Sequence, residues 1–117
     1  MGDNIILNQS FEFAVRIVNV YKYLTKEHKE FVLSKQLLRC GTSIGANVAE
    51  AQRGQSKADF RAKMSIALKE ANETEYWLRL LFRTNYLYEA HFRSLEAEIH
   101  SIIGLLIAIC RSADENT

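Results

Sequence analysis

Apolar residues recur every three or four positions over four stretches of the chain, with polar residues between them. This spacing places the apolar side chains on one face of an α-helix and predicts helices over about 10–25, 34–53, 56–84 and 88–111. The expected core positions are, helix by helix, Phe13, Ala14, Ile17, Val18, Tyr21 and Leu24; Leu37, Leu38, Gly41, Ile44, Val48 and Ala51; Phe60, Met64, Leu68, Ala71, Leu78 and Phe82; and Phe92, Leu95, Ile99, Ile102, Ile103, Leu106 and Ile109.

Residues that favour helix ends separate these stretches. Gly54 is a suitable stop for the second helix. The segment that begins at Ser56 and reaches Asp59 three residues later matches a capping box with the shorter acid, so the third helix should begin there. Asn85 and Tyr86 mark the break before the fourth helix. Amphipathic helices with such short connections predict an all-α, antiparallel up-down four-helix bundle.

The length of the chain, 117 residues, suits one hydrophobic core and is too short for two. We therefore expect a single domain over residues 1–117, with short tails at about 1–9 and 112–117. Proline is absent and there are only five glycines, which counts against a sandwich or barrel with many tight turns. A content of 48% hydrophobic and 25% charged residues is typical of a folded domain and argues against disorder.

The chain shows no secretory signal, and its longest apolar run, 102–110, is about half the roughly 20 residues that a membrane helix needs. We expect a cytoplasmic protein without membrane contact. Cys40 and Cys110 lie far apart and belong to no CxxC pair, which favours reduced packing thiols over a disulfide or a zinc site. The sequence predicts no metal, no cofactor and no small-molecule substrate.

The middle of the second helix is unusual because Gly41, Gly45 and Ala49 recur every four residues. A glycine inside a helix costs about 1 kcal/mol relative to alanine, so another interaction must compensate. The favoured interpretation is a groove without side chains against which a neighbouring helix packs closely. The alternative is a ligand that approaches the exposed backbone.

Polar residues form a row along the second helix, and one carboxylate interrupts the apolar stripe of the third helix. The row consists of Arg39, Ser43, Asn47 and Glu50, and the carboxylate is Glu75. A half-buried carboxylate needs a donor or a cation. We expect Arg39 or Asn47 to be the partner of Glu75, within a structural network that fixes the register of the helices.

The third helix carries a second apolar row that a single bundle cannot bury together with its core stripe. This row consists of Ile66, Tyr76, Trp77, Leu80 and Leu81. An exposed aromatic and aliphatic patch of this kind is typical of an interface, so the row predicts self-association. A wider core is the alternative.

Charge is balanced overall, at a formal +1, but uneven along the chain. Residues 34–84 contain nine Lys and Arg against five Asp and Glu, so the second and third helices form the basic half. Such a surplus suits phosphate contacts, although it also occurs on faces that are merely solvated. The candidate nucleic-acid contacts are Lys35, Arg53, Lys57, Arg61, Arg79 and Arg83.

Several segments resemble the four-helix bundle proteins of the 23S rRNA intervening-sequence protein family. They are residues 11–14, 43–51, 60, 66–68 and 73–75, and the core of the match is Ser-Ile-x-x-Asn-Val-Ala-Glu at 43–50. Many relatives have proline at the position of Gly45 and glycine at that of Ala51, so the chain is similar to a divergent branch. The resemblance implies a homopentamer and little established biochemistry. The chain is also similar to pentameric accessory proteins of diversity-generating retroelements, which contact nucleic acid and a reverse transcriptase.

The positions of the histidines test two enzyme classes. Di-iron bundles need Glu-x-x-His on two helices, and none of His28, His91 or His100 has a glutamate three residues before it. A HEPN-like metal-independent ribonuclease needs an arginine followed by a histidine after four to six residues, and Arg93 with His100 fits this spacing, although such a match arises easily by chance.

These observations predict a non-enzymatic homo-oligomer, pentameric by the resemblance, that binds RNA or acts as a scaffold associated with rRNA. One alternative is an accessory protein that contacts a reverse transcriptase and nucleic acid. The other is the ribonuclease that uses Arg93 and His100.

Overall fold

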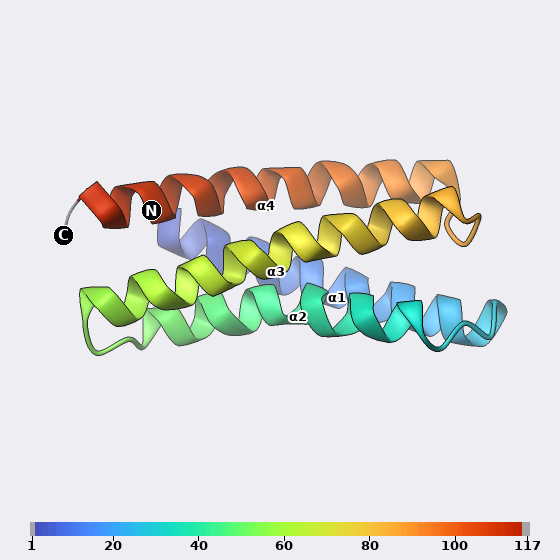
Figure 1. Cartoon of the computed structure of the whole chain (residues 1–117), viewed down its shortest axis with the longest axis horizontal. Helices are drawn as coiled ribbons and strands as arrows, with labels where there is room; N and C mark the ends of the chain where they lie inside the picture. The colour runs from blue at the N-terminus through green and yellow to red at the C-terminus, as the bar shows by residue number, and fades with distance from the viewer. Residues whose placement is uncertain (1, 116–117) are drawn as a thin grey trace.

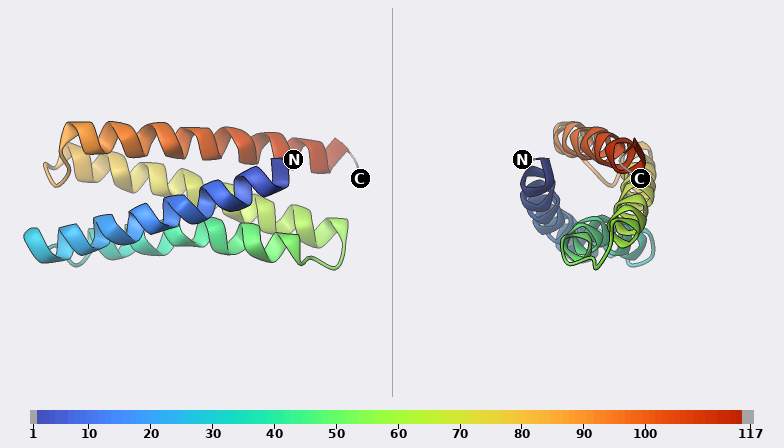
Figure 2. Two further views of the ribbon diagram at one scale, coloured as in Figure 1. Left: turned by 180° about the vertical axis from the view of Figure 1, so that it is seen from behind. Right: turned by 90° about the vertical axis from the view of Figure 1, so that its left-hand side faces the viewer.

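The computed structural model describes residues 2–115 and contains four α-helices. They are α1 (Gly2–Glu27), α2 (Leu33–Gln52), α3 (Lys57–Arg83) and α4 (Glu89–Glu115). Successive helices run in opposite directions along a body that measures 46 × 21 × 19 Å (Figure 1). Viewed along this body, the helices follow one another around the long axis (Figure 2). The predicted four-helix bundle is confirmed.

Two predicted tails are helical instead. The first helix begins at Gly2 rather than near residue 10, because Ile6 continues the apolar stripe seven residues before Phe13 and is fully buried. The last helix continues past Arg111 to Glu115, where nothing in the sequence interrupts it. Residues 1, 116 and 117 of the predicted tails lie outside the described residues.

Side chains in the connections fix the helix ends. Ser56 caps α3, with its Oγ accepting the backbone N–H of Asp59 at 3.1 Å, as predicted. Asn85 adopts a positive φ of 71° directly after α3, which confirms the predicted break. At the start of α2, the carboxylate of Glu30 accepts the backbone N–H groups of Leu33 and Ser34 at 2.9 and 2.7 Å.

The core runs the length of the bundle and contains most of the predicted positions. Others, such as Val18 and Phe60, are only partly buried at its edge. Leu81 is fully buried, so its assignment to an outward apolar row was wrong: it lies three residues after Leu78, on the core side of α3. The fully or nearly fully buried apolar residues that the prediction omitted are Ile6, Val20, Cys40, Ala67, Leu81 and Leu87.

The glycines of α2 bring α1 close to it. A Cβ added at Gly41 would lie 2.8 Å from Cγ2 of Ile17, and one added at Gly45 would lie 3.2 Å from the backbone oxygen of Ser10. The predicted close helix packing is therefore confirmed. α1 packs more extensively against α2 than against α4, and its N-terminal end approaches α4 (Figure 2).

Candidate assembly and nucleic-acid surfaces

The polar row of α2 does not form one network. The Oγ of Ser43 donates to the backbone oxygen of Arg39 at 2.6 Å, and the Nδ2 of Asn47 donates to that of Ser43 at 2.8 Å. The two charged ends of the row reach α3 instead. Arg39 lies 3.6 Å from a carboxylate oxygen of Glu73, and the Nζ of Lys63 lies 3.1 Å from Glu50. The row therefore ties α2 to α3 through separate, partly exposed ion pairs.

Glu75 has a different partner from the one predicted. Its carboxylate pairs with Nε2 of His100 on α4, not with Arg39 or Asn47. The reason is its position around α3, because Glu75 lies on the side that packs against α4 whereas Arg39 and Asn47 belong to α2. The carboxylate remains 30% exposed, so this pair contributes little to stability.

The predicted apolar row of α3 is largely accessible, apart from Leu81. Ile66 and Tyr76 are exposed, the latter at 58%, while Trp77 and Leu80 are partly buried. Tyr76 packs edge-on against Trp77 with ring centroids 5.1 Å apart, and Nε1 of Trp77 donates to Glu73 at 3.2 Å. We call Ile66, Tyr76, Trp77 and Leu80 the α3 apolar row.

A second exposed apolar surface lies on α1, and the sequence analysis missed it. Phe11 is 63% exposed and Val15 43%, while Leu7 and Val18 are partly buried beside them. These four residues, which we call the α1 apolar face, follow the three- and four-residue spacing of a helix. That spacing is the signal that could have identified the face. Residues of the core stripe, such as Phe13 and Ile17, stand between its members and obscure it.

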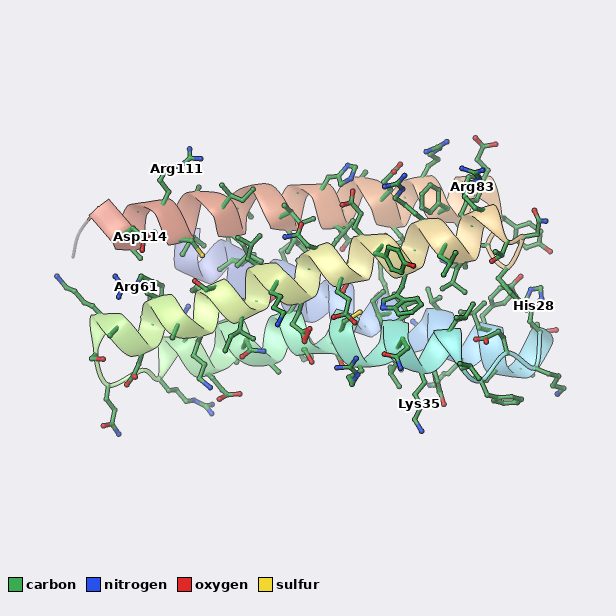
Figure 3. The ribbon with its side chains drawn as sticks, in the orientation of Figure 1. His28, Lys35, Arg61, Arg83, Arg111 and Asp114 are labelled. Atoms are coloured by element: carbon green, nitrogen blue, oxygen red, sulfur yellow. The ribbon has the colours of Figure 1, made fainter. Side chains whose placement is uncertain are left out.

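The six candidate phosphate contacts fall into two groups rather than one patch. Arg53, Lys57 and Arg61 lie at the end where α2 leads into α3, and Lys35, Arg79 and Arg83 lie toward the opposite end. Lys57 and Arg83 are the first and last residues of α3, so about 40 Å separates them at 1.5 Å per residue. Figure 3 shows Arg61 near one end of the bundle, with Lys35 and Arg83 toward the other.

One of the six residues, Arg61, is paired with a carboxylate. Arg61 is only partly exposed and lies 3.7 Å from a carboxylate oxygen of Asp114. The other five residues are exposed, and among the side chains of residues 5–114 none of the five, Arg79 and Arg83 included, forms an ion pair. These two arginines stand one turn apart on α3, where like charges repel each other unless an anion lies between them.

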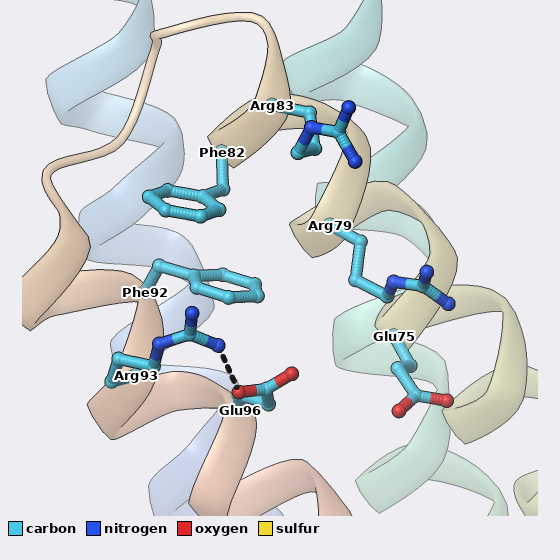
Figure 4. Close-up of a pocket in the computed structure, with 7 residues that line it drawn as sticks. All are labelled: Glu75, Arg79, Phe82, Arg83, Phe92, Arg93 and Glu96. Atoms are coloured by element: carbon cyan, nitrogen blue, oxygen red, sulfur yellow. Dashed lines mark hydrogen bonds and ion pairs between the residues drawn. The ribbon is translucent and has the colours of Figure 1, made fainter.

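Arg79 and Arg83 border a cavity of about 340 Å³ between α3 and α4, which we call the arginine pocket (Figure 4). Phe82 of α3 and Phe92 of α4 also line it, stacked with centroids 4.4 Å apart. The remaining lining residues are Arg93 and two carboxylates, Glu75 and Glu96. The guanidinium of Arg93 lies 5.2 Å from the ring centre of Phe92 and is paired with Glu96 at 3.0 Å. The pocket therefore contains two unpaired guanidinium groups beside one that is held in place.

The two cysteines are free thiols, as predicted. Cys40 is fully buried, and burial raises its pKa to about 11. Burial also raises the pKa of Cys110, which is only partly covered. Among the described side chains, those of residues 5–114, no three His, Cys, Asp or Glu gather as a metal ion would require. Neither does any helix of this part of the chain have the length and apolarity to span a membrane.

Comparison with known proteins identifies the family of the chain. A family model described as 23S rRNA-intervening sequence protein matches residues 2–108. The chain belongs to this family. A crystal structure of an S23 ribosomal protein family member from Bacteroides thetaiotaomicron, described as a protein with unknown function, is 58% identical. The match covers 95% of this chain and 99% of that one, with a TM-score of 0.93. No curated protein matches the chain.

The 23S rRNA-intervening sequence family description names no reaction, so the ribonuclease alternative depends on Arg93 and His100 alone. Both side chains are exposed on α4, but each has a carboxylate partner. Arg93 pairs with Glu89 and Glu96, and His100 pairs with Glu75. Both groups are thus held beside carboxylates on the surface of the bundle.

Proposed function

We propose that this protein is a cytoplasmic, non-enzymatic homo-oligomer, a ring of five subunits, that binds RNA associated with the ribosome or acts as a scaffold for it. Membership of the 23S rRNA-intervening sequence family supports the association with rRNA. The pentamer follows the resemblance in sequence. The basic residues of α2 and α3 supply the contacts to phosphate.

The presence of two different exposed apolar surfaces carries the proposal. α1 and α3 lie diagonally across the bundle, since each packs against α2 and α4. The α1 apolar face and the α3 apolar row therefore lie on helices that do not pack against each other. An interface between two unlike surfaces is heterologous, and it forms a closed ring when the rotation from one subunit to the next closes. Aromatic residues such as Phe11 and Tyr76 are typical of the buried centre of such interfaces.

A mixing experiment tests this head-to-tail assembly. Phe11→Glu places a charge on the α1 apolar face, and Tyr76→Glu places one on the α3 apolar row. Each variant alone should show the 13.4 kDa of one chain in light scattering. Their equimolar mixture should form dimers, because only one intact pair of surfaces remains. Ala97→Glu, on an exposed position of α4, is the control and should leave the ring intact.

Two results would contradict the assembly. If both variants keep the mass of the wild type, neither surface is part of the interface. If the mixture stays monomeric while the control forms a ring, the two surfaces do not bind each other. Circular dichroism of each variant verifies that the helices are still formed.

RNA binding is tested separately with a structured rRNA fragment and fluorescence anisotropy over a range of salt concentrations. The expected affinity falls with salt, because each neutralised phosphate releases counterions. The wild type should leave the fragment intact, and so should His100→Ala. Cleavage of the fragment that disappears in His100→Ala would establish the ribonuclease instead.

A further inference from the structure

One end of the bundle combines unpaired arginines with a chain of aromatic rings. The connection between α1 and α2 and that between α3 and α4 both lie there (Figure 1). The arginine pocket opens beside the last turns of α3. A second cavity of about 470 Å³, the aromatic pocket, is lined by residues of both connections and shares Phe82 with the first. Both volumes lie within the range of about 300–1,000 Å³ that is usual for ligand clefts.

Four rings at the aromatic pocket contact one another in sequence. Tyr88 lies 6.5 Å from Tyr23, Tyr23 lies 5.2 Å from His28, and His28 lies 5.4 Å from Tyr86, measured between ring centroids. The hydroxyl of Tyr23 and Nε2 of His28 are hydrogen-bonded at 3.0 Å, which holds the two inner rings in place. Tyr88, at the outer end, is 75% exposed.

An exposed aromatic ring supported from behind by other rings is a stacking surface for a planar group. Tyr88 has this character because its neighbour Tyr23 is fixed by His28. Burial, followed by the nearby Tyr88, raises the pKa of Tyr23, so its hydroxyl keeps its proton and this part of the pocket carries no phenolate charge. An aromatic surface next to the exposed guanidinium groups of Arg79 and Arg83 suits a ligand with a flat ring and an anionic group.

We propose that this end of the bundle binds unpaired nucleotides of RNA, with a phosphate in the arginine pocket at Arg79 and Arg83 and a base stacked on Tyr88. The inference deepens the proposed RNA binding and rests on it. Proteins recognise single-stranded loops and ends by stacking their bases on aromatic side chains. In a duplex the bases are already stacked on each other, so Tyr88 would have no free base face to contact.

The test uses the full-length chain, a fluorescent 12-nucleotide single-stranded oligouridine and a 12-base-pair RNA duplex. Tyr88→Ala should weaken binding of the single strand about 5- to 150-fold, the range for loss of one stacked base. Tyr88→Phe keeps the ring and should bind as the wild type does. Neither change should alter duplex binding, since the ring does not contact stacked bases.

The arginines are tested with a matched pair of double variants. Arg79→Gln with Arg83→Gln removes two charges from the proposed site. Lys22→Gln with Arg111→Gln removes two exposed charges from α1 and α4, outside the proposed contacts to phosphate. The first pair should lower the salt dependence of single-strand binding by about two phosphate contacts, and the second should change it much less. Circular dichroism verifies folding, which these exposed positions should not disturb.

The outcomes separate this inference from the proposed function. If the wild type binds the rRNA fragment but Tyr88→Ala and the Arg79 and Arg83 pair bind the single strand unchanged, the inference is wrong and the proposed RNA binding stands. If the wild type binds the single strand and the duplex with equal affinity and Tyr88→Ala weakens binding of both, the site does not select unpaired bases. The inference is then wrong. If the wild type binds neither the rRNA fragment nor the oligouridine, the proposed RNA binding and this inference both fail. The proposed assembly is then tested by the mass measurement alone.

Discussion

Replacing Gly41 with alanine tests the close packing of α1 on α2. The new Cβ would lie 2.8 and 2.9 Å from two carbons of Ile17, well inside the optimal carbon–carbon separation of about 3.5–4.0 Å. Ile17 is fully buried and cannot turn into solvent. Overpacking of this kind costs about 1–3 kcal/mol. Alanine also gains about 1 kcal/mol over glycine in a helix, so we expect a net loss of up to about 2 kcal/mol.

Gly104 provides the matched control. It lies within α4, and a Cβ added there meets nothing within 4 Å. Gly104→Ala should therefore gain stability by up to about 1 kcal/mol. Since the propensity gain is common to both variants, their difference isolates the steric cost at Gly41, which we expect to be about 1–3 kcal/mol.

Urea unfolding followed by circular dichroism, at one protein concentration for all variants, measures these differences. A second pair of variants isolates the contact between residue 41 and Ile17. In an Ile17→Ala background both close carbons are absent, so Gly41→Ala should become neutral or stabilising. The reasoning is refuted if Gly41→Ala is as stable as Gly104→Ala in the chain that retains Ile17.

Three further predictions concern single side chains. Glu30→Gln should cost about 1 kcal/mol, the usual value of a helix cap. Burial raises the pKa of Glu30, but backbone hydrogen bonds from α2 outweigh it and hold the pKa below its usual value. The advantage of the wild type over Glu30→Gln should therefore be complete above about pH 5 and disappear as the pH falls through the lowered pKa, in thermal melts from pH 7 to 3. Iodoacetamide at pH 8 should modify Cys110 before Cys40, because Cys40 is fully buried with a pKa of about 11, and equal rates by mass spectrometry would be contrary evidence. Glu75→Gln should cost less than about 1 kcal/mol in urea unfolding, because its pair with His100 is partly exposed, and a larger loss would indicate a role beyond this pair.

The periodicity of the chain predicts the four helices and their buried faces because each helix needs one apolar stripe for the core. It misplaces the start of α1, where Ile6 extends the buried stripe beyond the predicted helix. It also misses Glu30 as a cap. That role depends on the path of the connection, which returns the carboxylate to the first N–H groups of α2.

Side-chain partners were less predictable than helices. The partner of Glu75 depends on which helix packs on each side of α3, and the spacing of apolar residues within α3 does not contain this information. The same applies to Phe11 and Val15, because a sequence pattern shows that a helix has a second apolar face but not whether another helix covers it. The arginine pocket likewise required the structure, since Arg79 and Arg93 belong to different helices.

The mass of the wild-type protein in solution, measured by light scattering with and without a structured rRNA fragment at low and moderate salt, tests the central claim most directly. The account predicts about five times the 13.4 kDa of one chain, and a complex that gains RNA at low salt and loses it as salt rises. A mass of one chain under all conditions, with no RNA bound, would contradict both the ring and its proposed ligand.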